Sequence, residues 1–208
     1  MRQITLGRTG LSVCETGFGA LPIQRISRED AAGLLRYARA QGVNFFDTAR
    51  GYTDSEEKLG YAFSGTREGI FLATKSMARS RSAALAELDT SLSLLGTDHV
   101  DLWQLHCLPE LPDPNDPESA YAALLEARRA GKTRFIGMTA HRLDVALAAA
   151  ESGLYDTIQF PLNYLSTPEE LKLIDLCREK NIGLIAMKGM TSTVTAPAAT
   201  STEAISGD

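Results

Sequence analysis

The stretch VNFFDTARGY, residues 43–52, joins a short apolar run to a polar segment that contains a glycine. Similar apolar runs recur along the chain, and segments with helical spacing lie between them. Runs with little alternation are typical of strands buried on both faces of a parallel sheet. The predicted strands cover residues 43–48, 70–75, 100–106, 134–139, 157–161 and 183–188, with a first strand near 13–19.

Signals that begin and end helices lie between these runs. Ser27 and Thr167 each precede an acidic residue by three positions, which is the pattern of a capping box. Asp116-Pro117 predicts an N-cap followed by proline at the first helical position. The expected helix ends are Gly42, Gly96 and Gly131. Because strands and helices alternate, we expect right-handed crossover connections in a parallel sheet.

Polar residues end three successive predicted strands, and these residues favour a closed barrel over an open sheet. They are Asp47, Lys75 and His106, and Tyr52 follows Asp47 in the loop that leaves the same strand. In a barrel, the carboxyl ends of the strands and the loops after them form the active-site face. Neighbouring strands lie about 4.8 Å apart, so these side chains would point into one mouth.

The open alternative would be a nucleotide-binding sheet with a glycine-rich fingerprint. Gly17-Phe-Gly19 matches half of that fingerprint. However, Leu21-Pro22 stands where the third glycine and the helix should be, so the motif fails.

The four polar residues are suited to the reduction of a carbonyl group. A carbonyl that receives hydride at carbon needs a proton at oxygen, and Tyr52 can donate it, although the reference pKa of tyrosine is about 10. We expect the Lys75 ammonium to lower that pKa and Asp47 to keep Lys75 charged and oriented. His106 can polarise or orient the carbonyl oxygen or assist the proton transfer. Each residue alone has a structural explanation, but the set at consecutive strand ends favours catalysis.

Composition excludes several other classes of function. The formal net charge of −5 gives no long-range attraction for nucleic acid or an anionic membrane. The three cysteines form no disulfide framework or zinc motif, and the three histidines lack metal-ligand spacing. No signal peptide or membrane-length apolar run is present, so we expect a reduced, cytoplasmic protein without a metal.

The segments GFG (17–19), FFDTARGY (45–52), ATK (73–75) and DLWQLH (101–106) resemble those of the aldo-keto reductase family in order and spacing. The resemblance implies a TIM-type (β/α)8 barrel that reduces a small-molecule carbonyl substrate with NADP(H) or NAD(H). It also implies a tetrad, carried here by Asp47, Tyr52, Lys75 and His106. The closest branch often has a C-terminal ferredoxin-like segment with iron–sulfur cysteines, and no such cysteines occur in this sequence.

The resemblance also implies a set of cofactor-binding residues. Gly19 and Ala20 match the backbone near the ribose and diphosphate, and Thr139 and Gln159 match the pair that bonds the nicotinamide carboxamide. The full set is Gly19, Ala20, Asp47, Thr139, Ala140, Gln159, Met187 and Lys188. Ala140 and Met187 replace the usual polar and tyrosine side chains, so one hydrogen bond and the ring stacking are expected to be lost.

The end of the chain departs from the family pattern. We count about seven strands, so the barrel of residues 1–190 is predicted to be C-terminally incomplete, without the eighth strand that grips the adenosine. Residues 191–208 are rich in Thr, Ser and Ala, and they are expected to form a disordered tail. The unpaired strand edges are a potential site of self-association.

These observations leave three hypotheses. The leading one is an NAD(P)H-dependent oxidoreductase of aldehydes or ketones. The second is a truncated, non-catalytic remnant or interaction protein without a working cofactor site, with a variant in which another chain supplies the missing strand. The third makes Lys75 a Schiff-base lysine in a barrel of the aldolase type. The substrate, and the choice between NADPH and NADH, stay open.

Overall fold

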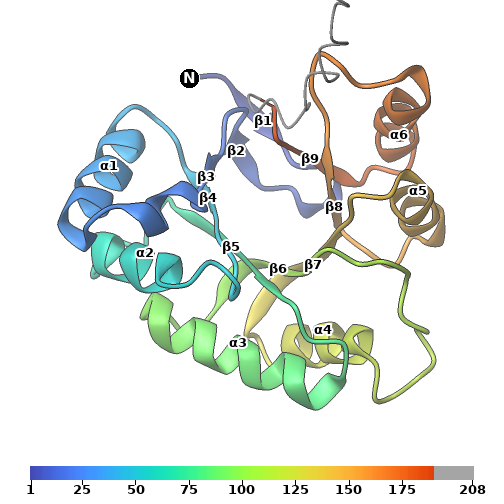
Figure 1. Cartoon of the computed structure of the whole chain (residues 1–208), viewed down its shortest axis with the longest axis horizontal. Coiled ribbons are helices and arrows are strands. Elements are labelled where there is room, and N and C mark those ends of the chain that lie inside the picture. Colours follow the sequence, from blue (N-terminus) through green and yellow to red (C-terminus); the bar gives the residue numbers. More distant parts are fainter. Residues whose placement is uncertain (190–208) are drawn as a thin grey trace, which may run out of the picture.

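A curved, parallel, seven-stranded sheet forms the centre of the molecule (Figure 1). The computed structural model describes residues 1–189, so the predicted disorder of 191–208 lies outside the described residues. The strands are β3 (Phe18–Gly19), β4 (Phe45–Asp47), β5 (Phe71–Ser76), β6 (Val100–Leu105), β7 (Thr133–Thr139), β8 (Thr157–Pro161) and β9 (Gly183–Met187). Each strand pairs in parallel with the next along the chain. This order confirms the predicted barrel with seven strands. Since β3 and β9 end the sheet in the described residues, self-association through these edges stays a prediction.

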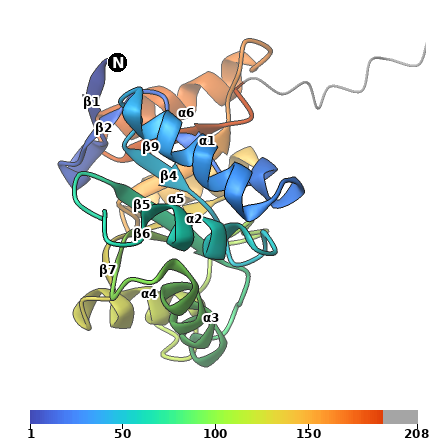
Figure 2. The same ribbon diagram turned by 90° about the vertical axis from the view of Figure 1, so that its left-hand side faces the viewer.

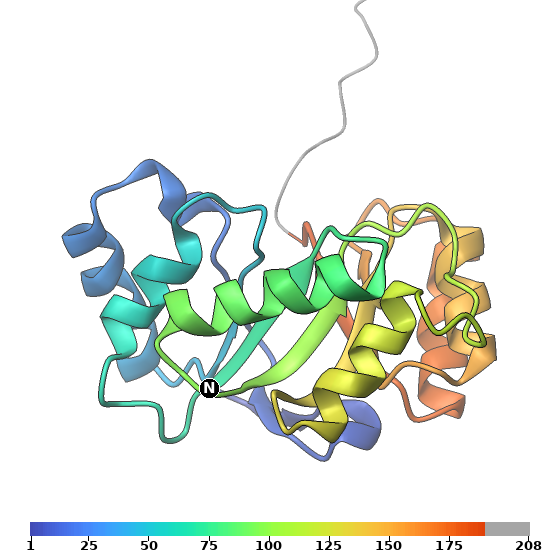
Figure 3. The same cartoon turned by 90° about the horizontal axis from the view of Figure 1, so that it is seen from below.

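In the described residues, six α-helices lie on the outer side of the sheet, and Figure 3 shows α3 and α4 in front of it, as seen from below. They are α1 (Arg28–Ala40), α2 (Ser55–Phe63), α3 (Arg81–Leu95), α4 (Ala120–Arg129), α5 (Leu143–Ser152) and α6 (Pro168–Glu179). The capping box of Thr167 with Glu170 is confirmed, and the Ser27 side chain accepts from the Asp30 backbone N–H. Gly96 ends α3 in the left-handed conformation.

The predicted start of α4 at Asp116-Pro117 is wrong. The N-cap is Ser119, whose hydroxyl accepts from the Ala122 backbone N–H. The Asp116 carboxylate instead accepts from the Glu118 N–H at 2.9 Å, so it stabilises a turn that precedes the helix. A short side chain that bonds a backbone N–H two residues on competes with helix capping.

A single first strand over residues 13–19 is also wrong. Val13 lies in β2 (Ser12–Cys14), which pairs with β1 (Gln3–Thr5) in an antiparallel hairpin, and only Phe18–Gly19 joins the parallel sheet. Figure 2 shows the hairpin at one end of the molecule, near β9. Gly7, with a φ of 50°, lies against β9 so closely that a Cβ would be 2.3 Å from the backbone nitrogen of Gly183. The hairpin therefore packs at the amino ends of the strands.

The alternation of side chains along each strand separates two cores. The inner core contains Phe45, Ala73 and Leu102, which pack against apolar side chains of the hairpin. Phe46 and Trp103 point to the opposite face and pack under the helices. Since side chains alternate along a strand, the next inward positions toward the carboxyl ends are Asp47, Lys75 and Gln104. The barrel interior is therefore apolar at the hairpin end and polar at the other.

Candidate active site

A cavity of about 500 Å³ lies at the polar end of the barrel. Its volume is in the range typical of small-molecule sites. The predicted site residues that line it are Gly19, Ala20, Asp47, Tyr52, Lys75, His106, Thr139, Gln159, Met187 and Lys188. Ala140 does not, because its side chain is 0% exposed and packs in the outer core.

An ion pair between Lys75 and Asp47 forms the floor of the cavity. Lys75 Nζ lies 2.6 Å from Asp47 Oδ2 and donates to the Thr48 carbonyl oxygen at 2.7 Å. The Lys75 residue is only 1% exposed. Asp47 Oδ1 is buried without a hydrogen-bond partner among the described residues, so one carboxylate oxygen stays available to a ligand.

Tyr52 lies over this pair. The Lys75 ammonium is 5.3 Å from the centroid of the Tyr52 ring, and the ring meets that of His106 edge to face at 5.7 Å. Burial, and then the negative charge of Asp47, raise the pKa of Tyr52 well above its usual value of about 10. The expected net lowering of this pKa is therefore wrong, because burial of the phenol and the charge of Asp47 together outweigh the Lys75 ammonium.

The His106 ring is kept neutral by its surroundings. Burial, followed by the nearby charges of Lys75 and Arg79, lowers the pKa of His106 to about 4. Its Nδ1 atom is buried and makes no hydrogen bond within residues 1–189. Arg79 holds the backbone here, since its guanidinium donates to the His106 carbonyl oxygen at 2.7 Å.

The predicted strand over residues 100–106 ends one residue early, and a turn places His106 and Cys107. Both residues lie beyond the strand, and Cys107 has a φ of 50°. The Cys107 N–H donates to Thr139 Oγ1 at 2.8 Å. The turn is therefore anchored to Thr139 at the end of β7.

A chain of amide hydrogen bonds crosses the floor of the cavity. Gln104 Nε2 donates to Gln159 Oε1 at 3.2 Å, and Gln159 Nε2 donates to Asp47 Oδ2 at 3.1 Å. Gln104 was not among the predicted site residues, although it lies two residues after Leu102 on the inner face of β6. Gln104 Oε1 is buried and has no partner in the described part of the chain. This network orients Asp47 toward Lys75.

A second missed group supports the Tyr52 turn from outside the barrel. The Glu56 carboxylate, 1% exposed, accepts from Thr74 Oγ1 at 2.6 Å and pairs with Arg50. The Arg50 backbone N–H donates to the Lys75 carbonyl oxygen at 3.0 Å. Strand β5 thus holds Lys75 on its inner face and, through Thr74, the turn before Tyr52 on its outer face.

The described residues fit the nicotinamide end of a dinucleotide. The unpartnered Oδ1 of Asp47 is an acceptor on a residue that lines the cavity, and the amide of Gln159 and the hydroxyl of Thr139 keep further hydrogen-bonding capacity. Within residues 1–189, no group of three or more His, Cys, Asp or Glu side chains is placed to hold a metal ion. No helix in that range is long and apolar enough to cross a bilayer.

The mouth of this parallel barrel carries Asp47, Tyr52, Lys75 and His106. This combination of fold and side chains is typical of one class of oxidoreductases. The model described as "Aldo/keto reductase family" matches residues 15–206, so the chain belongs to this family.

Curated relatives agree with the family. The chain is 32% identical over 200 residues to L-galactose dehydrogenase of Arabidopsis thaliana, covering 87% of this chain and 63% of that protein. It is 28% identical over 203 residues to the NADH-specific methylglyoxal reductase of Escherichia coli, covering 86% and 62%. The chain therefore spans less than two thirds of the length of these relatives.

Solved structures give the same result. An aldo-keto reductase from Bacillus halodurans in its holo form superposes with a TM-score of 0.78 at 26% identity, over 89% of this chain and 65% of that one. A putative aldo-keto reductase from Pseudomonas aeruginosa gives 0.77 at 26% identity, over 88% and 76%.

Proposed function

We propose that the chain is an NAD(P)H-dependent oxidoreductase that reduces aldehyde or ketone groups of small molecules. The observation that carries the proposal is the convergence of Tyr52, His106 and the Lys75–Asp47 pair at one cavity. The names of the relatives, which include a dehydrogenase and a methylglyoxal reductase, support the reaction class.

Each side chain has a distinct part in this reaction. A nicotinamide cofactor held beside Thr139 and Gln159 would supply the hydride that the carbonyl carbon needs. Tyr52, which stays protonated because its pKa is raised, donates a proton to the carbonyl oxygen. The neutral His106 ring, which lines the same cavity as Tyr52, donates a hydrogen bond to that oxygen and orients it. The Lys75 ammonium, held by Asp47, stabilises the phenolate that is left on Tyr52.

The cofactor would be held along one side of the cavity. Thr139 and Gln159 are suited to the carboxamide, and Met187 offers an apolar contact to the ring. The backbone of Gly19 and Ala20 can approach the ribose and diphosphate. Lys188 also lines the cavity, and its ammonium group could pair with a phosphate of the cofactor.

The Schiff-base hypothesis has less support. A lysine acts as a nucleophile only as the neutral amine, and its activation needs a lowered pKa. Lys75 Nζ instead donates to the Asp47 carboxylate and to the Thr48 carbonyl oxygen, so the nitrogen is already engaged by two acceptors.

Cofactor titration tests the proposal against the remnant hypothesis. We expect NADPH or NADH to bind with micromolar affinity, measured by the change in nicotinamide fluorescence. Lys188→Met should weaken binding several-fold, because a phosphate contact is lost. The matched control is Lys172→Met on the exposed face of α6, which should bind as the wild type does. Absence of binding to either cofactor would favour the remnant.

We expect the rate of carbonyl reduction to vary little with pH. The pKa of His106 is about 4 and that of Tyr52 is raised. The His106 ring therefore stays neutral and the Tyr52 phenol stays protonated through the neutral range. The profile of kcat/KM should therefore be flat from about pH 6 to about pH 9. Initial rates at saturating cofactor check this, with circular dichroism at each pH as the control for unfolding. A limb with an apparent pKa near 7 would contradict these roles.

A further inference from the structure

Lys58 is a buried cation in a place that is electrostatically unfavourable. It lies in the first turn of α2, where the helix dipole favours negative charge. The residue is only 4% exposed. Burying an ammonium group is costly unless hydrogen bonds compensate. The position of Lys58 therefore requires an explanation in its contacts.

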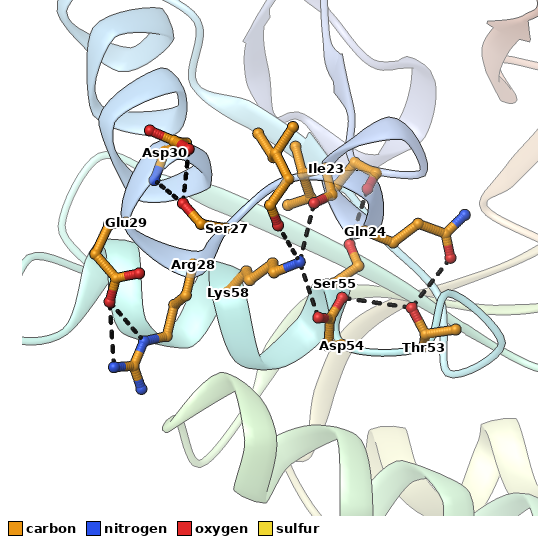
Figure 4. A network of polar contacts seen from close by, with 12 residues as sticks. Ile23, Gln24, Ser27, Arg28, Glu29, Asp30, Thr53, Asp54, Ser55 and Lys58 are labelled. Carbon is orange, nitrogen blue, oxygen red and sulfur yellow. Dashed lines mark hydrogen bonds and ion pairs between the residues drawn. The ribbon is translucent and has the colours of Figure 1, made fainter.

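The Lys58 ammonium uses all three of its donors. Nζ donates to the carbonyl oxygens of Ile23 at 3.1 Å and Ile26 at 2.8 Å, and it lies 2.8 Å from Asp54 Oδ2 (Figure 4). Ile23 belongs to the short helix η2 (Pro22–Arg25), which follows β3. Lys58 thus connects the segment after β3 to the beginning of α2.

Two further hydrogen bonds join the same parts of the chain. Ser55 Oγ donates to the Ala20 carbonyl oxygen at 2.9 Å, and Thr53 Oγ1 donates to Gln24 Oε1 at 3.1 Å. Figure 4 shows Thr53, Asp54 and Ser55 between Lys58 and Gln24. Thr53 has a φ of 42°, a backbone conformation that needs support from its surroundings. Residues 53–55 directly follow Tyr52, and the Ser55 N–H donates to the Tyr52 carbonyl oxygen at 2.8 Å.

The segment that Lys58 holds is also a wall of the cavity. Ala20, Leu21 and Pro22 line the same space as Tyr52. Lys58 therefore joins two walls, one that carries Tyr52 and one that the proposed cofactor would contact.

We propose that Lys58 is a positioning residue that sets the place of Tyr52 relative to a bound cofactor. This inference rests on the proposed function. Lys58 touches neither substrate nor cofactor, and it acts by fixing the segment of residues 20–26 against the turn of residues 50–55. A displacement of reacting groups by about 1 Å can lower a rate about 100-fold.

Hydrogen–deuterium exchange tests the physical part of the proposal without any activity. In Lys58→Met, which keeps the length of the side chain and removes the donors, peptides covering 20–26 and 50–55 should exchange about tenfold faster. Lys58→Arg should stay close to the wild type, because the charge and donors are retained. Lys172→Met is the matched control, and its exchange in both segments should equal that of the wild type. Unchanged exchange in Lys58→Met would overturn the proposal.

Steady-state kinetics test the consequence for catalysis. Lys58→Met should lower kcat about 10- to 100-fold while the KM for the carbonyl substrate changes less than about threefold. Lys58→Arg should recover most of the rate. Faster exchange with an unchanged kcat would overturn the positioning role.

The failure of this proposal can be told apart from the failure of the proposed function. If the wild type neither binds NAD(P)H nor reduces any carbonyl compound, the proposed function fails, and the exchange comparison alone decides whether Lys58 holds the two segments.

If Lys58→Met does not fold, Asp54→Asn replaces it, since Asp54 is half exposed and supplies one acceptor. That variant should show a smaller rise in exchange over the same two segments, and an unchanged pattern would overturn the proposal.

Discussion

Tyr52→Phe is expected to reduce the rate of carbonyl reduction by about 100- to 10,000-fold, the usual contribution of a positioned acid. The phenol is the proton donor in the proposed reaction, and phenylalanine keeps the ring against His106 and Lys75. The affinity for NAD(P)H should change little, because the ring still fills its place in the cavity.

Stability should be nearly unaffected by this substitution. No side-chain hydrogen bond of Tyr52 is present within residues 1–189, so Tyr52→Phe should change the free energy of unfolding by less than about 0.5 kcal/mol. Tyr37→Phe, on the exposed face of α1, is the matched control and should keep full activity. Turnover by Tyr52→Phe at a rate near that of the wild type would exclude Tyr52 as the acid.

Lys75→Met is expected to cause the largest loss of stability among these variants. Removal of the ammonium leaves the Asp47 carboxylate buried without its charge partner. Breaking a buried pair in this way typically costs about 3–5 kcal/mol. Urea unfolding followed by circular dichroism measures this loss, and carbonyl reduction should be abolished in the same variant.

Two comparisons isolate the cause of that loss. The double variant Asp47→Asn/Lys75→Met should regain part of the stability, because the uncompensated charge is removed, but it should stay inactive. Lys132→Met breaks the exposed pair with Asp89 and should cost less than about 1 kcal/mol. Equal losses of unfolding free energy in Lys75→Met and Lys132→Met would show that burial of the Lys75–Asp47 pair does not increase its effect on stability.

The main elements of the barrel were predictable because each strand carries its own signal. Continuous apolar runs identified the six strands after β3 to within two residues at each end, and polar residues at their ends predicted where the cavity would lie. Helices α2 and α5 were missed. For α2 the sequence did carry a signal, since Asp54 precedes Glu57 by three residues, although the Asp54 carboxylate pairs with Lys58 and does not cap the helix. For α5 there was no such signal, because Arg142 offers no acceptor.

The N-terminal hairpin was missed because its strands are three residues long and pair only with each other. So short a segment shows no period that separates it from the following β3. The buried charges of Glu56 and Lys58 in α2 were missed as well. A charged residue in a helix pattern predicts a solvated face, and only packing shows that these side chains are enclosed.

The parallel barrel and the residue types at its mouth can be read from strand period and chain order, because these decide which side chains point inward at the carboxyl ends. How those groups ionise, and which neighbours hold them, became visible only in the folded chain. The pKa of Tyr52 is raised and not lowered, because burial and the Asp47 charge come from segments that are distant along the chain. A charge in a buried site depends on every neighbour within a few ångströms, and those neighbours are known only once the chain is folded.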